Sequence, residues 1–401
     1  MMEFRPILSA MLRNKTGAIL IALQIAITLA IVCNAVFVIQ QRVAAMTRPT
    51  GLDVRDTFAV TMRGYTQDYR PAHAIRADLD ALRAMPGVAN AASMFHIPLS
   101  GGGWSSGFAT SPDPKAPTVD MGVFHTDTHG LDTLGVKLVA GRNFTNDEVI
   151  HTTRDTYTWP SVVILTRAAA DKLFPKGKAL GKAVYVGKQS MTVIGIVKHM
   201  QGSWVHWSGL NRNAIVPAVF LEPRAGFLVR AEPGQRDHVM KAVENKLQGL
   251  HVGNYVQRMR SMERFRSDSY VGDHAMTVIL MVVTGMILAI TAFGIVGLAS
   301  FSVNQRRKQI GTRRALGARR RDIVRYFLLE NWIITTVGVL IGSALAVALN
   351  LWLVTTYELN PIAWYYIPIG VVGLWALGLA AVLGPALRAA RISPALATRT
   401  V

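Results

Sequence analysis

The chain has 401 residues, enough for two or three soluble domains, but its apolar residues, 51% of the total, gather in a few long uncharged blocks. This distribution excludes an ordinary soluble protein and predicts an integral membrane protein. The net charge of +19 would suit a nucleic-acid-binding protein, but the basic residues lie beside the apolar blocks, where they set membrane orientation. We therefore expect no nucleic-acid partner. The single cysteine, Cys33, excludes an intrachain disulfide.

The first predicted elements are a basic N-terminal segment, residues 1–17, and an uncharged run, residues 18–39. A membrane-spanning helix needs about 20 apolar residues, so the run is long enough to cross a bilayer. A cleaved signal peptide usually has a shorter apolar region of about 7–15 residues. We therefore predict a cytoplasmic N-terminus followed by transmembrane helix 1, which acts as an uncleaved signal anchor.

Residues 40–274 contain no run that could span a membrane and mix acidic with basic residues, which predicts a folded extracytoplasmic domain. Two strand–helix–strand patterns begin and end it, with helices expected over 71–85 and 236–250. The residues between them, about 100–213, carry Gly- and Pro-rich loops and short β-prone runs. The expected fold is an α-helical membrane protein with four transmembrane helices plus an α+β extracytoplasmic domain, built from two βα units with a β-rich inserted lobe.

Three more uncharged runs follow, residues 275–303, 331–357 and 361–387, which we predict as transmembrane helices 2, 3 and 4. Between the first two lies the stretch 304–330, with nine Lys or Arg residues and two acids, and the tail 388–401 is basic again. Basic residues collect in cytoplasmic loops. The sequence therefore predicts that both termini and the 304–330 loop are cytoplasmic, in a multi-pass membrane protein.

Two of the basic stretches carry patterns that are more specific than their charge. Residues 307–318 read RKQIGTRRALGA, and residues 385–396 read PALRAARISPAL. Both resemble elements of the MacB/FtsX/Lol-type ABC transporter permeases, which have one span, a large external domain and three further spans. Gln309 stands where this family usually has Glu. Short motifs in the predicted external domain also resemble the MacB-type periplasmic domain: Gly141 to Phe144, Leu173 to Pro175, Gly181 to Lys182, Val193 to Val197, Ser269, Tyr270 and Asp273.

The resemblance implies a non-catalytic permease subunit of the bacterial inner membrane that binds no cofactor itself, while ATP and Mg are bound by a separate cytoplasmic ABC ATPase. It implies a second permease in a homo- or heterodimer, and it leaves room for a periplasmic adaptor and an outer-membrane channel. The implied function is mechanotransmission, in which ATP hydrolysis moves the periplasmic domains and exports a peptide, antibiotic or similar substrate. Two alternatives share this architecture: a Lol-like permease that extracts lipoproteins, and an FtsX-like scaffold that regulates an external hydrolase.

The 304–330 loop is the expected site of coupling to the ATPase. Gly311 and Gly317 would bound a short helix, whose apolar face would enter a groove on the ATPase while its arginines meet an acidic rim. An alternative is that the arginines only keep the loop on the cytoplasmic side. The predicted coupling residues are Arg306, Arg307, Gln309, Ile310, Gly311, Arg313, Arg314, Ala315, Leu316 and Gly317, with Ile310, Ala315 and Leu316 forming the apolar face.

No enzymatic or metal site is predicted. Residues 177–182, GKALGK, have three residues between the glycines where a phosphate-binding loop needs four, and Ala183 replaces the Ser or Thr that holds magnesium. The segment from His125 to His129, HTDTH, offers metal-ligating side chains, but it lacks helical spacing and precedes a glycine. A solvated strand or turn is the favoured interpretation.

Three tryptophans and one glutamate complete the candidate residues. Trp104, Trp204 and Trp207 lie in Gly-containing loops and are candidates for contact with a partner or cargo, although aromatic rings more often pack locally. Glu330 lies at the expected membrane boundary, where we expect it to pair with Arg325 or to face water.

Overall fold

The computed structural model describes residues 15–175, 177–248, 250, 253–357 and 361–392. The chain divides into two compact units, each described by itself. We call Met1–Thr47 together with Asp273–Val401 the membrane unit, and Arg48–Gly272 the β-rich unit.

Among its described residues, the membrane unit has four helices that are long and apolar enough to cross a membrane: α2 (Lys15–Thr47), α8 (Val271–Gln305), α10 (Arg320–Tyr357) and α11 (Tyr366–Ala390). The first three are 33, 35 and 38 residues long, whereas about 20 residues cross the hydrocarbon core. These helices therefore continue into their polar flanks beyond the predicted spans 18–39, 275–303 and 331–357. In particular, the second part of the predicted 304–330 loop is already the start of α10.

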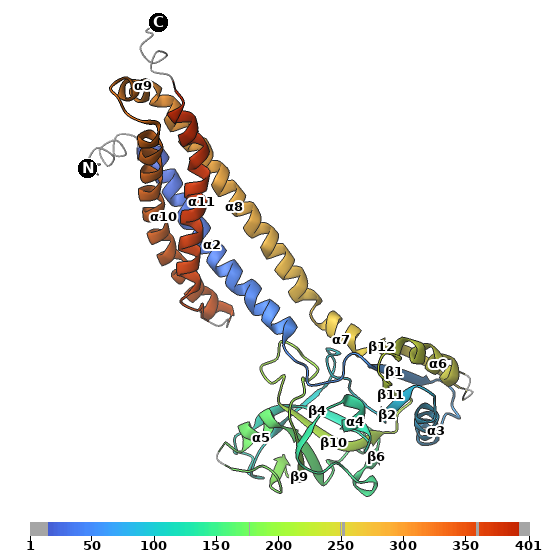
Figure 1. The fold of residues 1–401 in the computed structure, drawn as a ribbon. Coiled ribbons are helices and arrows are strands. Elements are labelled where there is room, and N and C mark those ends of the chain that lie inside the picture. Colours follow the sequence, from blue (N-terminus) through green and yellow to red (C-terminus); the bar gives the residue numbers. More distant parts are fainter. Residues whose placement is uncertain (1–14, 176, 249, 251–252, 358–360, 393–401) are drawn as a thin grey trace. The chain divides into compact units, whose positions relative to one another are not determined.

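Helix α10 packs along both α2 and α11 (Figure 1). Two glycines of α10 allow the close contact with α2. A Cβ atom at Gly338 would lie 2.8 Å from the carbonyl oxygen of Ala22, and one at Gly342 would lie 2.9 Å from Cα of Ala26. Small residues let membrane helices approach closely, so these glycines serve packing inside one chain.

Polar side chains of α2 bond to the other helices of the membrane unit. The hydroxyls of Thr28 and Thr291 are 2.7 Å apart, which joins α2 to α8. Nδ2 of Asn34 donates to the carbonyl oxygen of Ala346 at 3.1 Å, and Nδ2 of Asn350 donates to Oδ1 of Asn34 at 3.2 Å. Polar groups in hydrocarbon need such partners, and these bonds link α2 to α10 at a second point.

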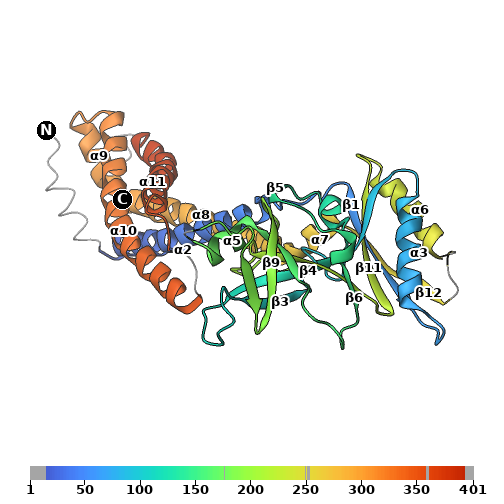
Figure 2. The ribbon, with the colours of Figure 1, turned by 90° about the horizontal axis from the view of Figure 1, so that it is seen from below.

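The β-rich unit begins and ends with the two predicted βα units. They consist of β1 (Thr57–Gly64), α3 (Pro71–Arg83), β2 (Val88–Ser93), β11 (Arg224–Ala231), α6 (Arg236–Gln248) and β12 (Asn254–Ser261), followed by α7 (Met262–Ser269). The four strands form an antiparallel sheet in the order β12-β1-β11-β2, the split βαβ arrangement. Helices α3 and α6 cover one face of this sheet (Figure 2). Their apolar sides pack on Phe58, Val60, Phe227 and Val229.

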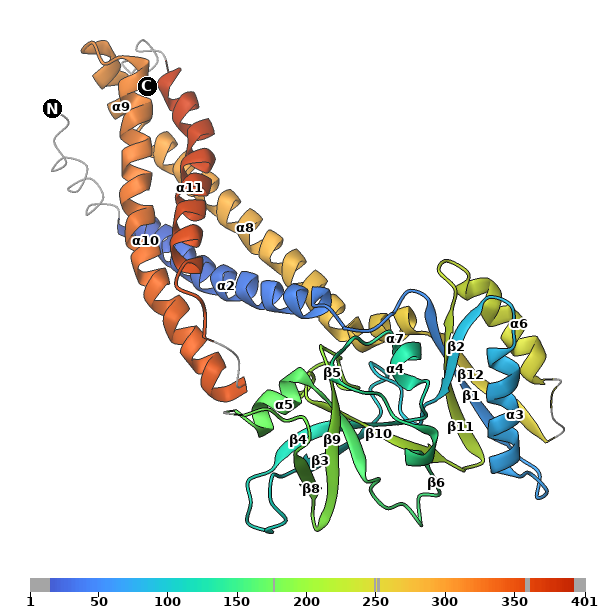
Figure 3. The same ribbon diagram turned by 60° about the horizontal axis from the view of Figure 1, so that its bottom comes forward.

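The inserted lobe forms a second, eight-stranded sheet (Figure 3). Its elements are β3 (Trp104–Phe108), β4 (Val119–Thr126), α4 (Gly130–Leu134), β5 (Leu138–Gly141), η1 (Asn146–Glu148), β6 (Ile150–Thr152), β7 (Val162–Thr166), α5 (Arg167–Leu173), β8 (Ala183–Val186), β9 (Gln189–Val197) and β10 (Asn213–Phe220). The main path is β3-β4-β10-β7-β9-β5, with β6 on β10 and β8 on β9. Two main-chain hydrogen bonds of 2.9 Å between Ala109 and Tyr185 bring β8 back to the end of β3, so the sheet curls around its own apolar core.

The end of the inserted lobe differs from the predicted boundary at residue 213. Strand β10 starts there and is the central strand of the second sheet, pairing with β4, β7 and β6. Proline argues against a central strand because it has no N–H group to donate. Pro217 is tolerated because it lies where β10 changes its parallel partner from β4, up to Pro217, to β6, from Ala218.

Helix α3 buries one carboxyl group within the first layer, our name for the four-stranded sheet together with α3 and α6. Asp78 is 0% exposed, and burial raises its pKa from 3.8 to about 7. Because the folded-state pKa is raised, the stability linked to this group is fully present below about pH 4 and is lost as the pH rises through 7. We expect Asp78→Asn to stabilise the β-rich unit on the order of 2 kcal/mol at pH 8 and to change little at pH 4. Thermal unfolding of both proteins at the two pH values measures this, and an equal difference at both would contradict it.

Candidate functional site

The basic segment between α8 and α10 forms a short helix, α9 (Arg307–Ala315), and a tight turn. Gly317 has φ +99°, the left-handed conformation that glycine adopts readily after a helix. The N–H of Ala318 donates to the carbonyl of Arg313 at 3.1 Å, and that of Gly317 donates to the carbonyl of Arg314 at 3.2 Å. This is a Schellman ending, and Asp322 then accepts the N–H of Arg319 at 3.0 Å to begin α10.

The helix differs from the prediction at its start. Gly311 was expected to precede a helix over 312–316, but α9 begins at Arg307 and runs through Gly311, which is buried. The four residues before Gly311 include Arg, Lys and Gln, which favour a helix. A single glycine lowers helix stability by only about 1 kcal/mol, so these neighbours outweigh it.

Charged and aromatic contacts fix the segment to α10 and to the residues that follow α11. Arg306 forms an ion pair with Glu330 at 3.0 Å and also donates to the Tyr326 hydroxyl at 3.3 Å. The Arg313 guanidinium lies 5.1 Å from the centre of the Tyr326 ring, and Arg314 donates to the carbonyl of Ile392 at 2.5 Å.

The partner of Glu330 is therefore Arg306, and the predicted pairing with Arg325 is wrong. Residues five positions apart on a helix point in different directions, whereas those three or four apart are neighbours. The end of α8 brings Arg306 to Glu330 instead.

The residues that were predicted to form one apolar face point in two different directions. Ile310 is buried in the core of the membrane unit, together with Ile323 and Phe327. Leu316 is 83% exposed, and Ala315 is exposed beside it. Residues 310 and 316 are six positions apart, which corresponds to a rotation of about 240° around a helix. The expectation that Ile310 offers itself to a partner is therefore wrong.

The remaining predicted coupling residues surround Leu316 or hold the segment in place. Arg307, Gln309, Arg313 and Gly317 are exposed, whereas Arg306 and Arg314 are half-buried by the contacts described above. The outer surface of α9 is thus strongly basic with one large apolar side chain at its end. Such a surface can bind an acidic partner that has an apolar pocket.

The three candidate tryptophans are half-buried and make local contacts. The ring centre of Trp104 lies 5.1 Å from that of His125 and 5.3 Å from that of Tyr157, within an aromatic cluster of the inserted lobe. Trp204 and Trp207 pack edge to face with their centres 5.7 Å apart. Local packing, the alternative considered above, describes what these rings do within this chain.

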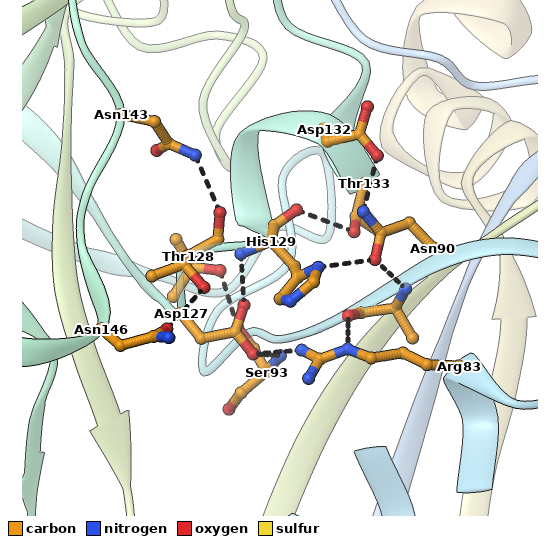
Figure 4. Close-up of polar contacts among 12 residues, drawn as sticks. Arg83, Asn90, Ser93, Asp127, Thr128, His129, Asp132, Thr133, Asn143 and Asn146 are labelled. Atoms are coloured by element: carbon orange, nitrogen blue, oxygen red, sulfur yellow. Dashed lines mark hydrogen bonds and ion pairs between the residues drawn. The ribbon is translucent and has the colours of Figure 1, made fainter. Parts of the chain in front are cut away.

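The HTDTH segment forms the centre of a polar network (Figure 4). Oδ2 of Asp127 accepts Nη2 of Arg83 at 2.8 Å and the N–H of Ser93 at 3.1 Å, while its Oδ1 accepts the N–H of His129 at 2.9 Å. Nδ1 of His129 is 3.0 Å from Oδ1 of Asn90. Arg83, Asn90 and Ser93 belong to the first layer, and Asp127 and His129 to the inserted lobe. The network therefore fastens the two layers together.

The other histidine of this segment is buried among aromatic rings. Nε2 of His125 lies 3.2 Å from the Tyr157 hydroxyl, and burial, followed by the charge of His96, lowers the pKa of His125 to about 3. Within the described residues, no three His, Cys, Asp or Glu side chains gather as a metal site would require. The polar role of Asp127 was not apparent from the sequence because Arg83 and Ser93 lie 44 and 34 positions away.

The motif from Gly141 to Phe144, which reads GRNF, stabilises the loop that follows it in the inserted lobe. Arg142 donates two hydrogen bonds to the Glu148 carboxylate, at 2.8 and 2.6 Å, and the side chains of Thr145 and Glu148 form a capping box at η1. The bond from Arg142 lowers the pKa of Glu148 to about 2, so this carboxylate is ionised at any ordinary pH.

Comparison with known proteins identifies both units. Residues 18–246 match the MacB-like periplasmic core domain, and residues 281–394 match the FtsX-like permease C-terminal domain. A macrolide export ATP-binding/permease protein MacB of Neisseria meningitidis (strain MC58) is 26% identical over 279 residues, covering 66% of this chain and 41% of the relative. Its counterpart in Chromobacterium violaceum is 28% identical over 221 residues, covering 53% and 32%. The ABC transporter permease YknZ of Bacillus subtilis is 25% identical over 283 residues, covering 67% of each chain.

Two solved structures are similar to about half of the chain. The periplasmic region of MacB from Actinobacillus actinomycetemcomitans is 18% identical with a TM-score of 0.35, covering 54% of this chain and 94% of that one. The extracellular domain of the ABC-type transporter YknZ is 19% identical with a TM-score of 0.32, covering 50% and 100%.

The two family matches confirm the resemblance that the basic motifs predicted. The MacB relatives are much longer proteins, and the chain spans only about a third to two fifths of their length. The match to the periplasmic core domain alone nevertheless covers more than half of the chain. This chain therefore belongs to the MacB/FtsX-type ABC transporter permeases.

Proposed function

We propose that this chain is the permease subunit of an ABC exporter of the mechanotransmission type in the bacterial inner membrane. In this proposal both termini and α9 are cytoplasmic, and the β-rich unit is periplasmic. The distribution of basic residues supports the orientation, because such residues collect on the cytoplasmic side. The MacB relatives, which are named as macrolide export proteins, support export rather than lipoprotein extraction or hydrolase regulation.

The ATPase that drives the exporter is proposed to be a separate cytoplasmic chain that binds ATP and Mg and docks on α9. The main support is the position of Leu316, an exposed leucine at the end of a basic helix. The opposite side of the segment is held to α10 by buried Ile310 and by the Arg306–Glu330 ion pair. A displacement of α9 by the ATPase would therefore move α10 directly.

A second permease chain, identical or different, is proposed to pack on α8. This helix contributes few buried residues to the membrane unit, and its large apolar side chains stay exposed: Ile279, Val282, Met286, Ile290 and Phe293. A dimer would place two α9 helices against two ATPase subunits. Substrate would then leave the periplasm through partner proteins, an adaptor and an outer-membrane channel.

The coupling proposal is tested by Leu316→Asp. Loss of a buried leucine contact removes about 1.5–3 kcal/mol, so ATPase binding should weaken at least about tenfold. The Leu316 side chain is exposed within this chain, so insertion and folding should not change. Copurification with the ATPase, and stimulation of ATP hydrolysis in nanodiscs, measure the effect.

Val139→Asp is the matched control, because Val139 is also an exposed apolar residue but lies on β5 of the β-rich unit. This variant should bind the ATPase normally. Full binding and turnover by Leu316→Asp would show that α9 is not the coupling element. Ile310→Asp is unsuitable as a test, because a charge in the buried core would unfold the segment.

A further inference from the structure

The β-rich unit contains a second feature that the coupling proposal does not involve, a cavity of about 300 Å³. Thr61 of β1 and Gly226 of β11 lie in its wall, whereas their neighbours Val60, Met62 and Phe227 pack beneath α3 and α6. Adjacent residues of a strand point to opposite faces, so the cavity lies on the face of the four-stranded sheet that α3 and α6 leave uncovered. Its volume is at the lower end of the range for small-molecule sites, about 300–1,000 Å³.

Three arginines line this cavity, Arg154, Arg224 and Arg258, and no acidic side chain is among the described residues of its wall. None of the three forms an ion pair with a carboxylate in the described parts of the chain. Glu222 accepts the backbone N–H of Arg154 at 2.9 Å but does not line the cavity. The local excess of positive charge is therefore not neutralised by the protein itself.

Aromatic rings hold two of the guanidinium groups in place. The Arg154 guanidinium lies 4.9 Å from the centre of the Phe95 ring, and that of Arg258 lies 5.8 Å from the centre of the Phe265 ring. Stacking on a ring leaves the N–H groups at the edge of the guanidinium free to bind a carboxylate, sulfonate or phosphate. The same phenylalanines, with Met94, give the wall an apolar part.

His96 provides an independent observation in the same wall. Its Nδ1 is buried and has no hydrogen-bond partner among the described residues. Burial, followed by the charges of Arg154 and Arg224, lowers the pKa of His96 to about 4, so the ring is neutral near pH 7. A buried ring nitrogen without a partner is costly. Nδ1 itself is closed to solvent, so His96 adds a neutral ring to the wall and no further positive charge.

We propose that this cavity binds a small organic anion. Arg154, Arg224 and Arg258 would hold its carboxylate, sulfonate or phosphate group, and Phe95, Phe265 and Met94 would contact an attached apolar or aromatic body. Arginine is well suited to this role because its planar donors match the geometry of these anions. The site stands whether the ligand is cargo or an effector, and it does not depend on ATPase coupling.

Naphthalene-1-sulfonate is a suitable probe, because it joins one anionic group to one aromatic body. Binding is measured by isothermal titration calorimetry with the full chain in phosphatidylcholine nanodiscs, and empty nanodiscs give the background. We expect saturable binding of one probe per chain that weakens as salt is raised, since the three arginines are exposed to screening. The uncharged analogue 1-naphthalenemethanol should bind at least about tenfold more weakly, as expected for the loss of a charged hydrogen-bonded group.

Arg224→Gln should weaken probe binding by about tenfold or more without changing thermal unfolding, because no other described side chain bonds to Arg224. Arg63→Gln is the control: Arg63 is an exposed arginine that faces Arg224 in the β1–β11 register but does not line the cavity. If Arg224→Gln unfolds, Arg258→Gln takes its place with the same expectation. The proposal is overturned if the probe does not saturate, if the neutral analogue binds equally well, or if Arg63→Gln loses as much affinity as the cavity variants.

Discussion

Asp127→Ala is expected to lower the free energy of unfolding of the β-rich unit by about 3 kcal/mol. The Asp127 carboxylate is only 12% exposed and accepts hydrogen bonds from Arg83, Ser93 and His129. Its removal leaves a partly buried guanidinium without its counter-charge and two backbone N–H groups without their acceptor. For a unit of about 225 residues this corresponds to a fall in the unfolding temperature of about 6–12 °C, measurable by thermal unfolding of the full chain.

Asp132→Ala is the matched control for this prediction. Asp132 also bonds to the first layer, to Arg230 at 2.8 Å and to Asn90 at 2.6 Å, but its side chain is 55% exposed. Exposed ion pairs contribute about 0–1 kcal/mol, so this variant should unfold close to the parent temperature. Equal losses of stability in the two variants would contradict the prediction that Asp127 is the main stabilising residue of the network.

Glu330→Ala is expected to destabilise the membrane unit by about 3–5 kcal/mol, because it leaves the Arg306 charge buried without its partner. The two side chains are only 11% and 16% exposed. Since Arg306 joins the end of α8 to α10, the variant should also lose the fixed orientation of α9. Unfolding in detergent and stimulation of the ATPase should therefore decline together.

A double substitution separates charge burial from packing. Replacing both Arg306 and Glu330 with Met removes the uncompensated charge and keeps similar volume, a change that is often neutral or stabilising. We expect this variant to unfold near the parent temperature. If it were as unstable as Glu330→Ala, the ion pair itself, rather than the cost of an unpaired charge, would be what stabilises α9.

The two βα units of the β-rich unit could be predicted because their signals are local. Pro71 begins α3, Pro86 and Gly87 follow its end, and Ile75, Leu79 and Leu82 repeat at helical spacing. The strand order β12-β1-β11-β2 could not be predicted, since it depends on pairing between strands that are more than a hundred residues apart. The end of the inserted lobe was predicted wrongly because Pro217 weakens the sequence pattern of a strand over β10. The strand forms nevertheless, because it pairs with β4 and β6.

The basic segment illustrates the same limit for a functional site. Its charge and its family motif could be predicted from the sequence, but the direction of each side chain could not. Ile310 and Leu316 are both large aliphatic residues, yet Ile310 is buried and Leu316 is 83% exposed. Only the phase of α9 against α10 distinguishes them, and that phase is set by contacts of Arg306, Arg313 and Ile310 with a different helix.

The inserted lobe is joined to the four-stranded sheet through two neighbouring strands, so it could be exchanged as one piece. The chain leaves the four-stranded sheet after β2 and returns to it at β11, and these two strands are hydrogen-bonded neighbours in which Ser93 pairs with Phe227. The chain therefore enters and leaves the lobe, residues 94–223, at neighbouring points of one sheet. The lobe also contacts the segment before β1, where the N–H of Gln201 donates to the carbonyl of Thr50 at 2.8 Å. A chimaera could carry the lobe of another permease on this sheet, with its own surface chemistry, provided that the bonds between the two are rebuilt, among them Arg83–Asp127, Arg230–Asp132 and Gln201–Thr50. One layer of the β-rich unit could thus be exchanged while the other is kept.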